Sequence, residues 1–331
     1  MPQRVKMSDV ARTAGVSVAT VSKVVNGRWG VAEATVDRVQ QVIQQLGYEA
    51  NLGAQGLRSH RTNVLGILVA EFEPFSAELL KGASSRVAQT EYELLAYTAG
   101  ARGSMVGWER RSLARLSGTL IDGAILVTPT VVDTKQSVHV VAIDPHTGPC
   151  GMPTVDSDNF AGATLATRYL LGLGHRYIGF IGGRPDLESA RLREAGFRKA
   201  MAEAGVSVDE ALVRVGGYRT ETALGPAREL LSRAERPTAV FAANDISAIA
   251  TIAAARSLGL AVPDDLSVIG FDNVPESALA SPPLTTIEQP LQHMGAEALG
   301  LLVDLIAGVQ RATHVRLPTE LVVRASCTPP R

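Results

Sequence analysis

The chain contains little of what marks secreted, membrane or metal-binding proteins. It has 2 cysteines in 331 residues, Cys150 and Cys327, and no metal-ligand spacing surrounds either, which excludes a disulfide framework and a zinc site. No apolar run approaches the length that spans a bilayer, and the N-terminus lacks the apolar stretch of a secretory signal. We therefore expect a protein that stays in the cytosol and contacts no membrane.

Sequence motifs of catalysis are also missing. Gly172 and Gly174 begin a stretch that resembles a glycine-rich cofactor loop, but Tyr177 stands where the third glycine is needed. The sequence contains no phosphate-loop lysine, no zinc motif and no nucleophile elbow, and its histidines lack an evident serine or cysteine partner. These absences argue against an enzyme, and we expect no cofactor.

Charge is distributed unevenly along a chain whose composition is that of a globular protein. The length suits two or three domains, and the overall net charge is -1. Residues 1–61 hold eight basic and four acidic residues, a net charge of +4, whereas the remainder holds 24 basic and 29 acidic residues, a net charge of -5. A basic head on an acidic body suits a head that meets phosphate and a body that avoids it.

The basic head has the pattern of a helix-turn-helix. Ser8 can cap a short first helix, and Ser17 can cap a second helix that runs on to Asn26. Gly15 gives the turn between them the backbone freedom that it needs. A third helix, over residues 33–46, would bury valines and an isoleucine beneath this pair.

The second helix of the head presents small side chains on its outer face. Three valines share its inner stripe, which leaves four residues near its N-terminal half able to reach base edges: Val18, Ala19, Ser22 and Lys23. A three-helix bundle with no role in DNA binding is the alternative. Exposed Val18 and Ala19 favour the DNA-binding interpretation, because a plain solvated face would not carry small apolar groups.

After residue 61 short apolar stretches alternate with helical ones. Seven of them read as strands: 64–69, 94–97, 124–127, 138–143, 178–181, 240–242 and 268–271. Continuous apolar strands that alternate with helices predict parallel sheets covered on both faces. Because there are too many strands for one small sheet, we expect two doubly wound parallel-sheet lobes with a ligand between them, at the carboxyl ends of the strands.

Polar and aromatic side chains follow several of these strands: Glu71, Phe75, Asp144, Asn244 and Asp272 among them. Each one could instead cap a helix or close a turn. Their joint placement favours a binding site, since carboxylates and amides accept paired hydrogen bonds from vicinal hydroxyls and aromatic faces cover the apolar side of a sugar ring. The combination suits a carbohydrate.

The head resembles the DNA-binding domain of the lactose/galactose repressor (LacI/GalR) family. It contains the segments DVA, AGVS, TVS and VVNG, and then LGY with Asn51 three residues after the tyrosine, in the order and spacing of that family. The resemblance implies that Ser17, Thr20 and Asn26 hold the phosphate backbone while Val18, Ala19 and Lys23 read the major groove. Val18 and Ala19 offer only apolar contact, so recognition of bases by hydrogen bonding would depend on Ser22 and Lys23.

The resemblance also assigns residues 51–61 to a hinge helix that pairs with its dimer mate in the minor groove. Its DNA-contacting positions would be Asn51, Ala54 and Leu57, with the leucine wedged into the central base step. Gly53 and Gly56 each cost about 0.5–1 kcal/mol in a helix relative to alanine. We therefore expect a flexible linker that becomes helical on the operator.

The body resembles the family's periplasmic-binding-protein-like core through the segments DNFAG, LGH, GGR, RLREAGF, AND, GFD and PLTTI. The resemblance implies that Arg193, Asn244 and Asp272 hydrogen-bond an effector, with Asp144 at the same cleft. Phe160 and Tyr218 would stack against it, with Phe75 and the loop of Glu71 contributed by the first lobe. The alternative for Arg193 is a surface cation paired with a glutamate on its own helix.

The implied protein is a repressor that binds a pseudo-palindromic DNA operator as a homodimer under the allosteric control of a mono- or oligosaccharide. Its parts would be a helix-turn-helix domain (1–50), the hinge (51–61) and the body (62–328). One lobe would comprise 62–160 and 291–317, the other 161–290 and 318–328. A purine or another non-sugar effector is an alternative. So is a sugar-binding protein of the cytosol, although that class has no use for a helix-turn-helix.

Overall fold

The computed structural model describes residues 5–25, 29–48, 61–98, 107–130, 138–149 and 151–331. The chain forms two compact units. The first, the head, extends from Met1 to Thr62, and the second, the body, comprises residues 63–117 and 121–331.

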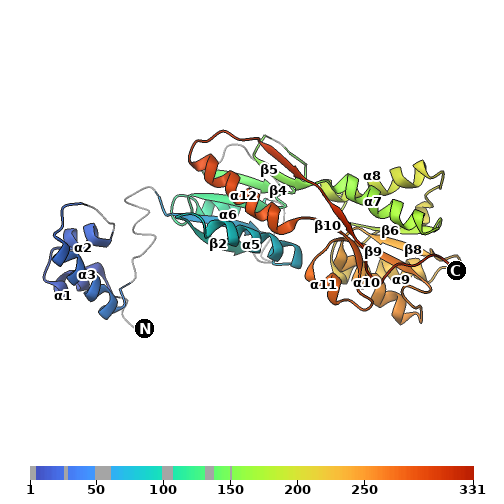
Figure 1. The fold of residues 1–331 in the computed structure, drawn as a ribbon, viewed down its shortest axis with the longest axis horizontal. Helices are drawn as coiled ribbons and strands as arrows, with labels where there is room; N and C mark the ends of the chain where they lie inside the picture. Colours follow the sequence, from blue (N-terminus) through green and yellow to red (C-terminus); the bar gives the residue numbers. More distant parts are fainter. Residues whose placement is uncertain (1–4, 26–28, 49–60, 99–106, 131–137, 150) are drawn as a thin grey trace. The chain divides into compact units, whose positions relative to one another are not determined.

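The head consists of α1 (Met7–Ala14), α2 (Val18–Val25) and α3 (Glu33–Leu46), drawn in blue in Figure 1. One fully buried valine from each helix, Val10, Val21 and Val39, forms the centre of its core. The predicted helix-turn-helix and the predicted bounds of the third helix are confirmed.

The start of the first helix differs from the prediction that Ser8 caps it. The helix begins two residues earlier, at Met7 with Lys6 as the N-cap, and the Asp9 carboxylate accepts a hydrogen bond from the Lys6 backbone N–H at 2.9 Å. Asp9 thereby satisfies the helix start, and Ser8 lies inside the first turn. The second helix starts as predicted, since the Ser17 hydroxyl accepts from the Thr20 backbone N–H at 3.1 Å.

The body contains two six-stranded sheets, one in each lobe. In the first lobe the strand order is β11-β5-β4-β3-β1-β2 and every pair is parallel. Its strands are β1 (Val64–Val69), β2 (Glu93–Thr98), β3 (Gly123–Val127), β4 (His139–Ile143), β5 (Thr154–Ser157) and β11 (His314–Leu317).

In the second lobe the order is β12-β10-β9-β8-β6-β7, with only the β10–β12 pair antiparallel. The strands are β6 (Ile178–Gly182), β7 (Val213–Val215), β8 (Ala239–Ala242), β9 (Ser267–Asp272), β10 (Thr285–Glu288) and β12 (Glu320–Val322). The two doubly wound lobes are thus present, and the seven predicted strands correspond to β1–β4, β6, β8 and β9.

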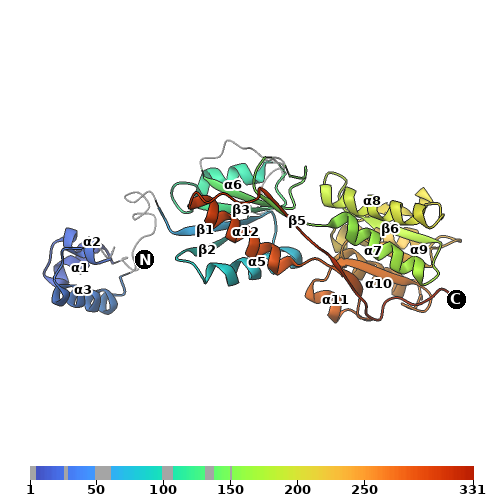
Figure 2. The ribbon, with the colours of Figure 1, turned by 45° about the horizontal axis from the view of Figure 1, so that its top comes forward.

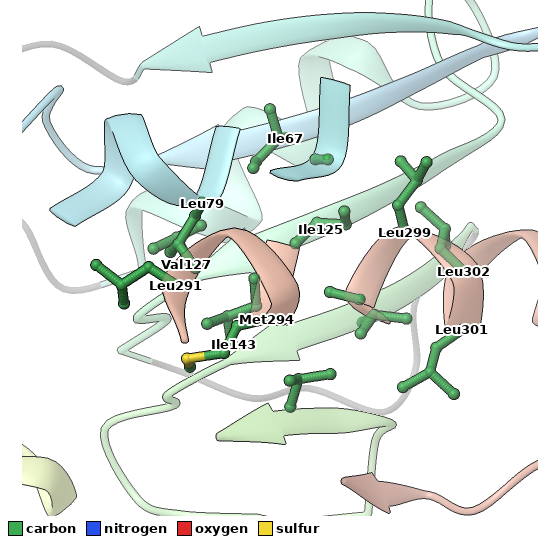
Figure 3. Packing of buried hydrophobic residues seen from close by; sticks show 14 of the residues in the cluster. Ile67, Leu79, Ile125, Val127, Ile143, Leu291, Met294, Leu299, Leu301 and Leu302 are labelled. Atoms are coloured by element: carbon green, nitrogen blue, oxygen red, sulfur yellow. The ribbon is translucent and has the colours of Figure 1, made fainter. Parts of the chain in front are cut away.

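Helices cover both faces of the first sheet. Alternate residues of β1 point to opposite sides, so that Ile67 packs under α5 (Pro74–Val87) and α12 (Leu291–Ile306), whereas Leu68 packs under α6 (Trp108–Leu116). Figure 3 shows Leu79 of α5 and Met294 and Leu299 of α12 facing the strand residues. The first of these faces is the larger core of the lobe.

The second lobe is covered in the same way. The helices α7 (Asn159–Gly172) and α8 (Glu188–Glu203) lie side by side on one face, as Figure 2 shows, and pack on Phe180 and Phe241. The helices α9 (Thr220–Leu231) and α10 (Asp245–Ser257) cover the other face, and the short α11 (Pro275–Leu279) follows β9. Among the described residues, no helix combines the length and apolarity that crossing a bilayer requires.

The chain passes between the two sheets three times: from β5 to α7, from β10 to α12 and from β11 to β12. The crossings lie side by side. The Asp158 backbone N–H donates to the Leu317 carbonyl at 2.9 Å, and the Ser157 hydroxyl donates to the Gln289 side-chain carbonyl at 2.5 Å. We call these crossing segments, residues 157–159, 289–291 and 317–319, the junction.

Candidate functional site

A cavity lies between the two lobes of the body, at the carboxyl ends of strands from both sheets. Its empty volume, including the mouth open to solvent, is about 840 Å³. The structure brings seven of the eight proposed effector residues to its wall: Glu71, Phe75, Asp144, Arg193, Tyr218, Asn244 and Asp272.

Four residues of this wall have a backbone conformation that side chains other than glycine rarely adopt. The φ angle is 46° at Thr128, 44° at Asp144, 69° at Tyr218 and 112° at Asp272. Such conformations persist only where the surroundings hold them, and they concentrate at ligand sites. The strand ends are therefore shaped to present these side chains.

Arg193 of α8 forms the floor of the cavity and is 3% exposed. Its guanidinium carbon lies 3.9 Å from the centroid of the Phe271 ring and 5.4 Å from that of Tyr218, so the cation is enclosed by two aromatic faces. The alternative of a surface ion pair is wrong. The glutamates of its helix, Glu188 and Glu194, pair instead with other arginines.

The hydrogen bonds of Arg193 leave part of the guanidinium unused. Its Nε donates to Asn159 Oδ1 at 2.8 Å, and its Nη1 donates to the Ala243 carbonyl and to Asp272 Oδ1. Its Nη2 makes no hydrogen bond to any of the residues that the structure describes. Two N–H donors of a buried cation thus remain for a ligand.

Tyr218 lies against the backbone of Gly183. A Cβ atom at Gly183 would come within 2.2 Å of the tyrosine ring, so a residue with a side chain would displace the ring from the wall. The tyrosine hydroxyl is buried and has no hydrogen-bond partner within the described part of the chain. Ser189, which also lines the cavity, is the polar side chain beside this hydroxyl.

Asp144 follows β4 and is buried, with 8% of its surface exposed. No described residue donates a hydrogen bond to its carboxylate. Burial raises the pKa of this carboxyl to about 7, although the positive charge of Arg193 opposes the change. Asp144 is therefore an acceptor that only an occupant of the cavity can satisfy.

Asp272 and Asn244, unlike Asp144, make side-chain hydrogen bonds to other described residues. Asp272 Oδ1 accepts from Arg193 and, at 2.6 Å, from Gln289 Nε2, while its Oδ2 is unbonded among the described residues. Burial raises the pKa of Asp272 to about 6, against the lowering effect of Arg193. Asn244 caps α10 through the Ser247 N–H and donates to the Tyr218 carbonyl, so it holds the Tyr218 loop in place.

The outer face of α2 in the head is as the sequence predicts. Val18, at 46% exposure, Ala19 and Lys23 are exposed, while Val21 on the opposite side is fully buried. Ser17 is exposed as well, and its hydroxyl lies 2.9 Å from that of Thr20. The remaining proposed DNA contacts are Ser22, which is half-buried, and Asn26, Asn51, Ala54 and Leu57, which lie outside the described residues.

Comparison with known proteins identifies both units. Residues 6–51 match the family of bacterial regulatory proteins named after lacI, and residues 167–327 match the periplasmic binding protein-like domain. The chain is 34% identical to the transcriptional repressor PurR of Photobacterium profundum, over 97% of this chain and 98% of the relative. The chain belongs to the LacI family. It is thus a DNA-binding transcriptional regulator, and members of this family are not enzymes.

Two solved structures resemble this LacI-family chain over 98% of its length and 100% of their own. One is a complex of the transcriptional regulator CelR with cellobiose, with 33% sequence identity and a TM-score of 0.73. The other is the Lac repressor dimer bound to operator and the anti-inducer ONPF, with 26% identity and a TM-score of 0.85.

Phe160 is the one proposed effector residue of this LacI-family body that does not line the cavity. Its ring lies 5.5 Å from the Lys199 ammonium group instead. Successive residues of a helix point about 100° apart, so Phe160 is turned away where its neighbour Asn159 contacts Arg193. The expectation that Phe160 stacks on a ligand in this cavity does not agree with its position.

Charged residues from both lobes also line the cavity, among them the predicted Glu71. Arg219 of the second lobe bonds Glu71 of the first at 2.6 Å and lies 3.6 Å from Glu73. His146 of the first lobe, which also lines the cavity, lies 3.3 Å from Asp186 of the second. Sequence reasoning proposed neither Arg219 nor His146 as a site residue, although Arg219 follows the predicted Tyr218 directly and His146 comes two residues after Asp144.

Proposed function

We propose that this regulator is a homodimeric repressor whose affinity for a pseudo-palindromic operator is set by a small carbohydrate bound between the lobes. The proposal depends mainly on the unsatisfied polar groups of the cavity wall. Asp144 offers two carboxyl oxygens and Asp272 one, and Arg193 Nη2 lies on the same wall.

The number and kind of these groups favour a polyol. Buried acceptors without partners are costly, so a ligand binds well only if it supplies a donor to each of them. A sugar carries one donor and one acceptor on every hydroxyl, and vicinal hydroxyls fit the two oxygens of one carboxylate.

An aromatic residue in the wall of the cavity also suits a sugar ring. Phe75 at the edge can cover the apolar side of a ring. A purine is the alternative that the relative PurR suggests, and a purine base has no vicinal hydroxyls to pair with the two oxygens of one carboxylate.

A thermal-shift panel tests the ligand assignment. The full chain is melted with D-glucose, D-galactose, D-ribose, cellobiose, hypoxanthine and guanine, and we expect at least one carbohydrate to raise the Tm. Asp144→Asn and Arg193→Ala should abolish that rise. Arg198→Ala serves as the control, because Arg198 lies on the same helix but pairs with the surface residues Glu194 and Glu210. A rise with a purine alone would overturn the carbohydrate assignment.

The dimer has a separate test. A two-fold pair of heads can read two half-sites of one operator, and the Lac repressor structure that resembles this chain is itself a dimer on operator DNA. Sedimentation equilibrium of the full chain should give twice the 34.9 kDa mass of one chain. A monomer at micromolar concentration would contradict the proposed dimer and leave the ligand assignment standing.

A further inference from the structure

Five buried polar side chains form a closed ring of hydrogen bonds where the cavity floor meets the junction. The ring runs from Ser157 to Gln289, Asp272, Arg193 and Asn159, and each member is at most 5% exposed. The Gln289 side chain accepts from the Ser157 hydroxyl at 2.5 Å and donates to Asp272 Oδ1 at 2.6 Å. Arg193 links Asp272 to Asn159, whose Nδ2 donates to the Ser157 carbonyl at 3.2 Å.

The members of the ring come from both sides of the lobe boundary. Ser157 is the last residue of β5 in the first lobe, and Asn159 is the first of α7 in the second. Gln289 lies between β10 of the second lobe and α12 of the first. Arg193 and Asp272 line the cavity. The ring therefore ties two of the three crossings to the floor of the proposed ligand site.

The ring uses one half of each ligand-facing group and leaves the other half open. The hydrogen bonds of the ring use Oδ1 of Asp272 and leave its Oδ2 unbonded. They use Nε and Nη1 of Arg193 and leave its Nη2 unbonded among the described residues. A ligand can therefore bind both residues without breaking a bond of the ring. Binding fixes the two side chains more firmly, and the ring carries that restraint to the junction.

We propose that Gln289 is a positioning residue that couples the occupant of the cavity to the angle between the lobes through this ring. A change of that angle requires backbone rotation at all three crossings at once. The ring opposes independent rotation, because opening it leaves polar groups buried without partners. The coupling to a ligand depends on the proposed effector function, whereas the restraint on the lobes does not.

A backbone hydrogen bond at the mouth reports the lobe angle without any ligand. The Glu188 N–H, at the start of α8 in the second lobe, donates to the His146 carbonyl in the first lobe at 3.0 Å. Neither residue belongs to the ring. When the lobes separate, this amide loses its acceptor and exchanges with solvent deuterium, so the peptide spanning residues 186–190 measures the opening of the cleft.

The test is hydrogen exchange of the full chain with neither carbohydrate nor DNA present. Ser157→Ala removes the hydroxyl that bonds Gln289 and so opens the ring, while it leaves the Asn159 bond to the Ser157 carbonyl and the cavity wall unchanged. We expect at least tenfold faster exchange of the 186–190 peptide. Thr319→Val is the matched control, since it removes a hydroxyl of the same junction that lies outside the ring and donates only to the Asp158 carbonyl at 3.4 Å. In this variant the exchange rate of the 186–190 peptide should stay within twofold of the rate in the parent protein.

A second variant separates coupling from local damage. Gln289→Met keeps the shape of the side chain and loses its hydrogen bonds, so we expect it to speed exchange of the same distant peptide at least as much as Ser157→Ala. The double variant should exchange no faster than Gln289→Met, because both changes remove one shared bond. Additive effects, or faster exchange confined to residues 155–160 and 287–292, would overturn the proposal. No sugar enters the measurement, so that failure would leave the effector assignment untouched.

Discussion

Asp144 illustrates at the scale of one residue how a binding site is kept at a cost in stability. Its carboxyl is buried, unbonded among the described residues and raised in pKa to about 7 from an ordinary value of 3.8. Above about pH 4 the unfolded chain releases this proton, whereas the folded protein retains it until the pH approaches 7. The free energy of unfolding therefore falls as the pH rises from about 4 to about 7.

Asp144→Asn should remove this pH-dependent penalty. We expect the variant to have a higher Tm than the parent protein at pH 8, by several degrees, and nearly the same Tm at pH 4. Melting curves of the ligand-free protein at both values measure the difference, and Glu276→Gln on the surface controls for the loss of one negative charge. Equal effects of Asp144→Asn at the two pH values would show that the carboxyl is not held in a desolvated state.

Lys23 is an exposed cation on the outer face of α2. A charged contact to a base or phosphate is worth about 1–3 kcal/mol, so Lys23→Ala should weaken operator binding roughly 5- to 150-fold and flatten its salt dependence. Fluorescence anisotropy with an operator selected from random duplexes provides the measurement. Lys199→Ala, which removes the same charge from α8 of the body, should bind like the parent; equal losses in both variants would point to net charge alone.

Single residues also show where sequence reasoning reaches its limit. Asp144, Arg193 and Asp272 could be placed because each follows a recognisable strand or belongs to a family motif. Gln289 carries no local signal, since its role depends on hydrogen bonds to Ser157 and Asp272, which approach it only in the folded chain. The prediction that Phe160 faces the ligand was wrong by one position along α7: the preceding residue, Asn159, contacts Arg193, and Phe160 lies near Lys199. The sequence alone does not fix how α7 is rotated about its axis relative to α8.

At the scale of elements, α5 and α12 pack closely on the first sheet through two glycines. A Cβ atom at Gly82 would lie 1.8 Å from the Gln292 carbonyl oxygen, and one at Gly295 would lie 2.0 Å from that of Leu79. These obstacles are backbone atoms, which cannot move without shifting a helix. The two glycines therefore set the separation of the pair.

Gly82→Ala should destabilise the first lobe by about 1–3 kcal/mol, because overpacked helices must separate and expose part of the core. Urea denaturation followed by circular dichroism measures the loss. In Gly172→Ala, at the end of α7, the added methyl group meets nothing within 4 Å, and we expect a neutral or slightly stabilising effect there. A neutral result at Gly82 would mean that the two helices are free to move apart.

The strands that the sequence did not reveal share a physical feature. β5, β7, β10, β11 and β12 are three or four residues long, and several carry polar side chains such as Thr154, Asp156 and Arg316. The Arg316 guanidinium pairs with Asp156 at 2.8 Å on the neighbouring strand, so charges that suggest a loop are neutralised across the sheet. The strands with long apolar runs were identifiable because burial on both faces leaves a continuous signal.

For the whole molecule, a DNA-reading head and a ligand-binding body belong to one chain of the LacI family. The head exposes the α2 residues that we expect to contact DNA, and the body contains a cavity whose open donors and acceptors line the boundary between two lobes. Regulation requires that the ligand bind the DNA-binding arrangement of the molecule with a different affinity from that for the other arrangement, whichever of the two it favours. The coupling free energy between two such sites is commonly about 1–3 kcal/mol.

The most direct test of effector control is operator affinity measured with and without the carbohydrate that most raises the Tm of the full chain. Anisotropy titrations at one fixed salt concentration should show a change of at least fivefold, and Arg193→Ala should remove the change while still binding operator. The Arg198→Ala protein should respond like the parent. An operator affinity that stays constant in the parent protein while the carbohydrate is demonstrably bound would contradict control of DNA binding from this cavity.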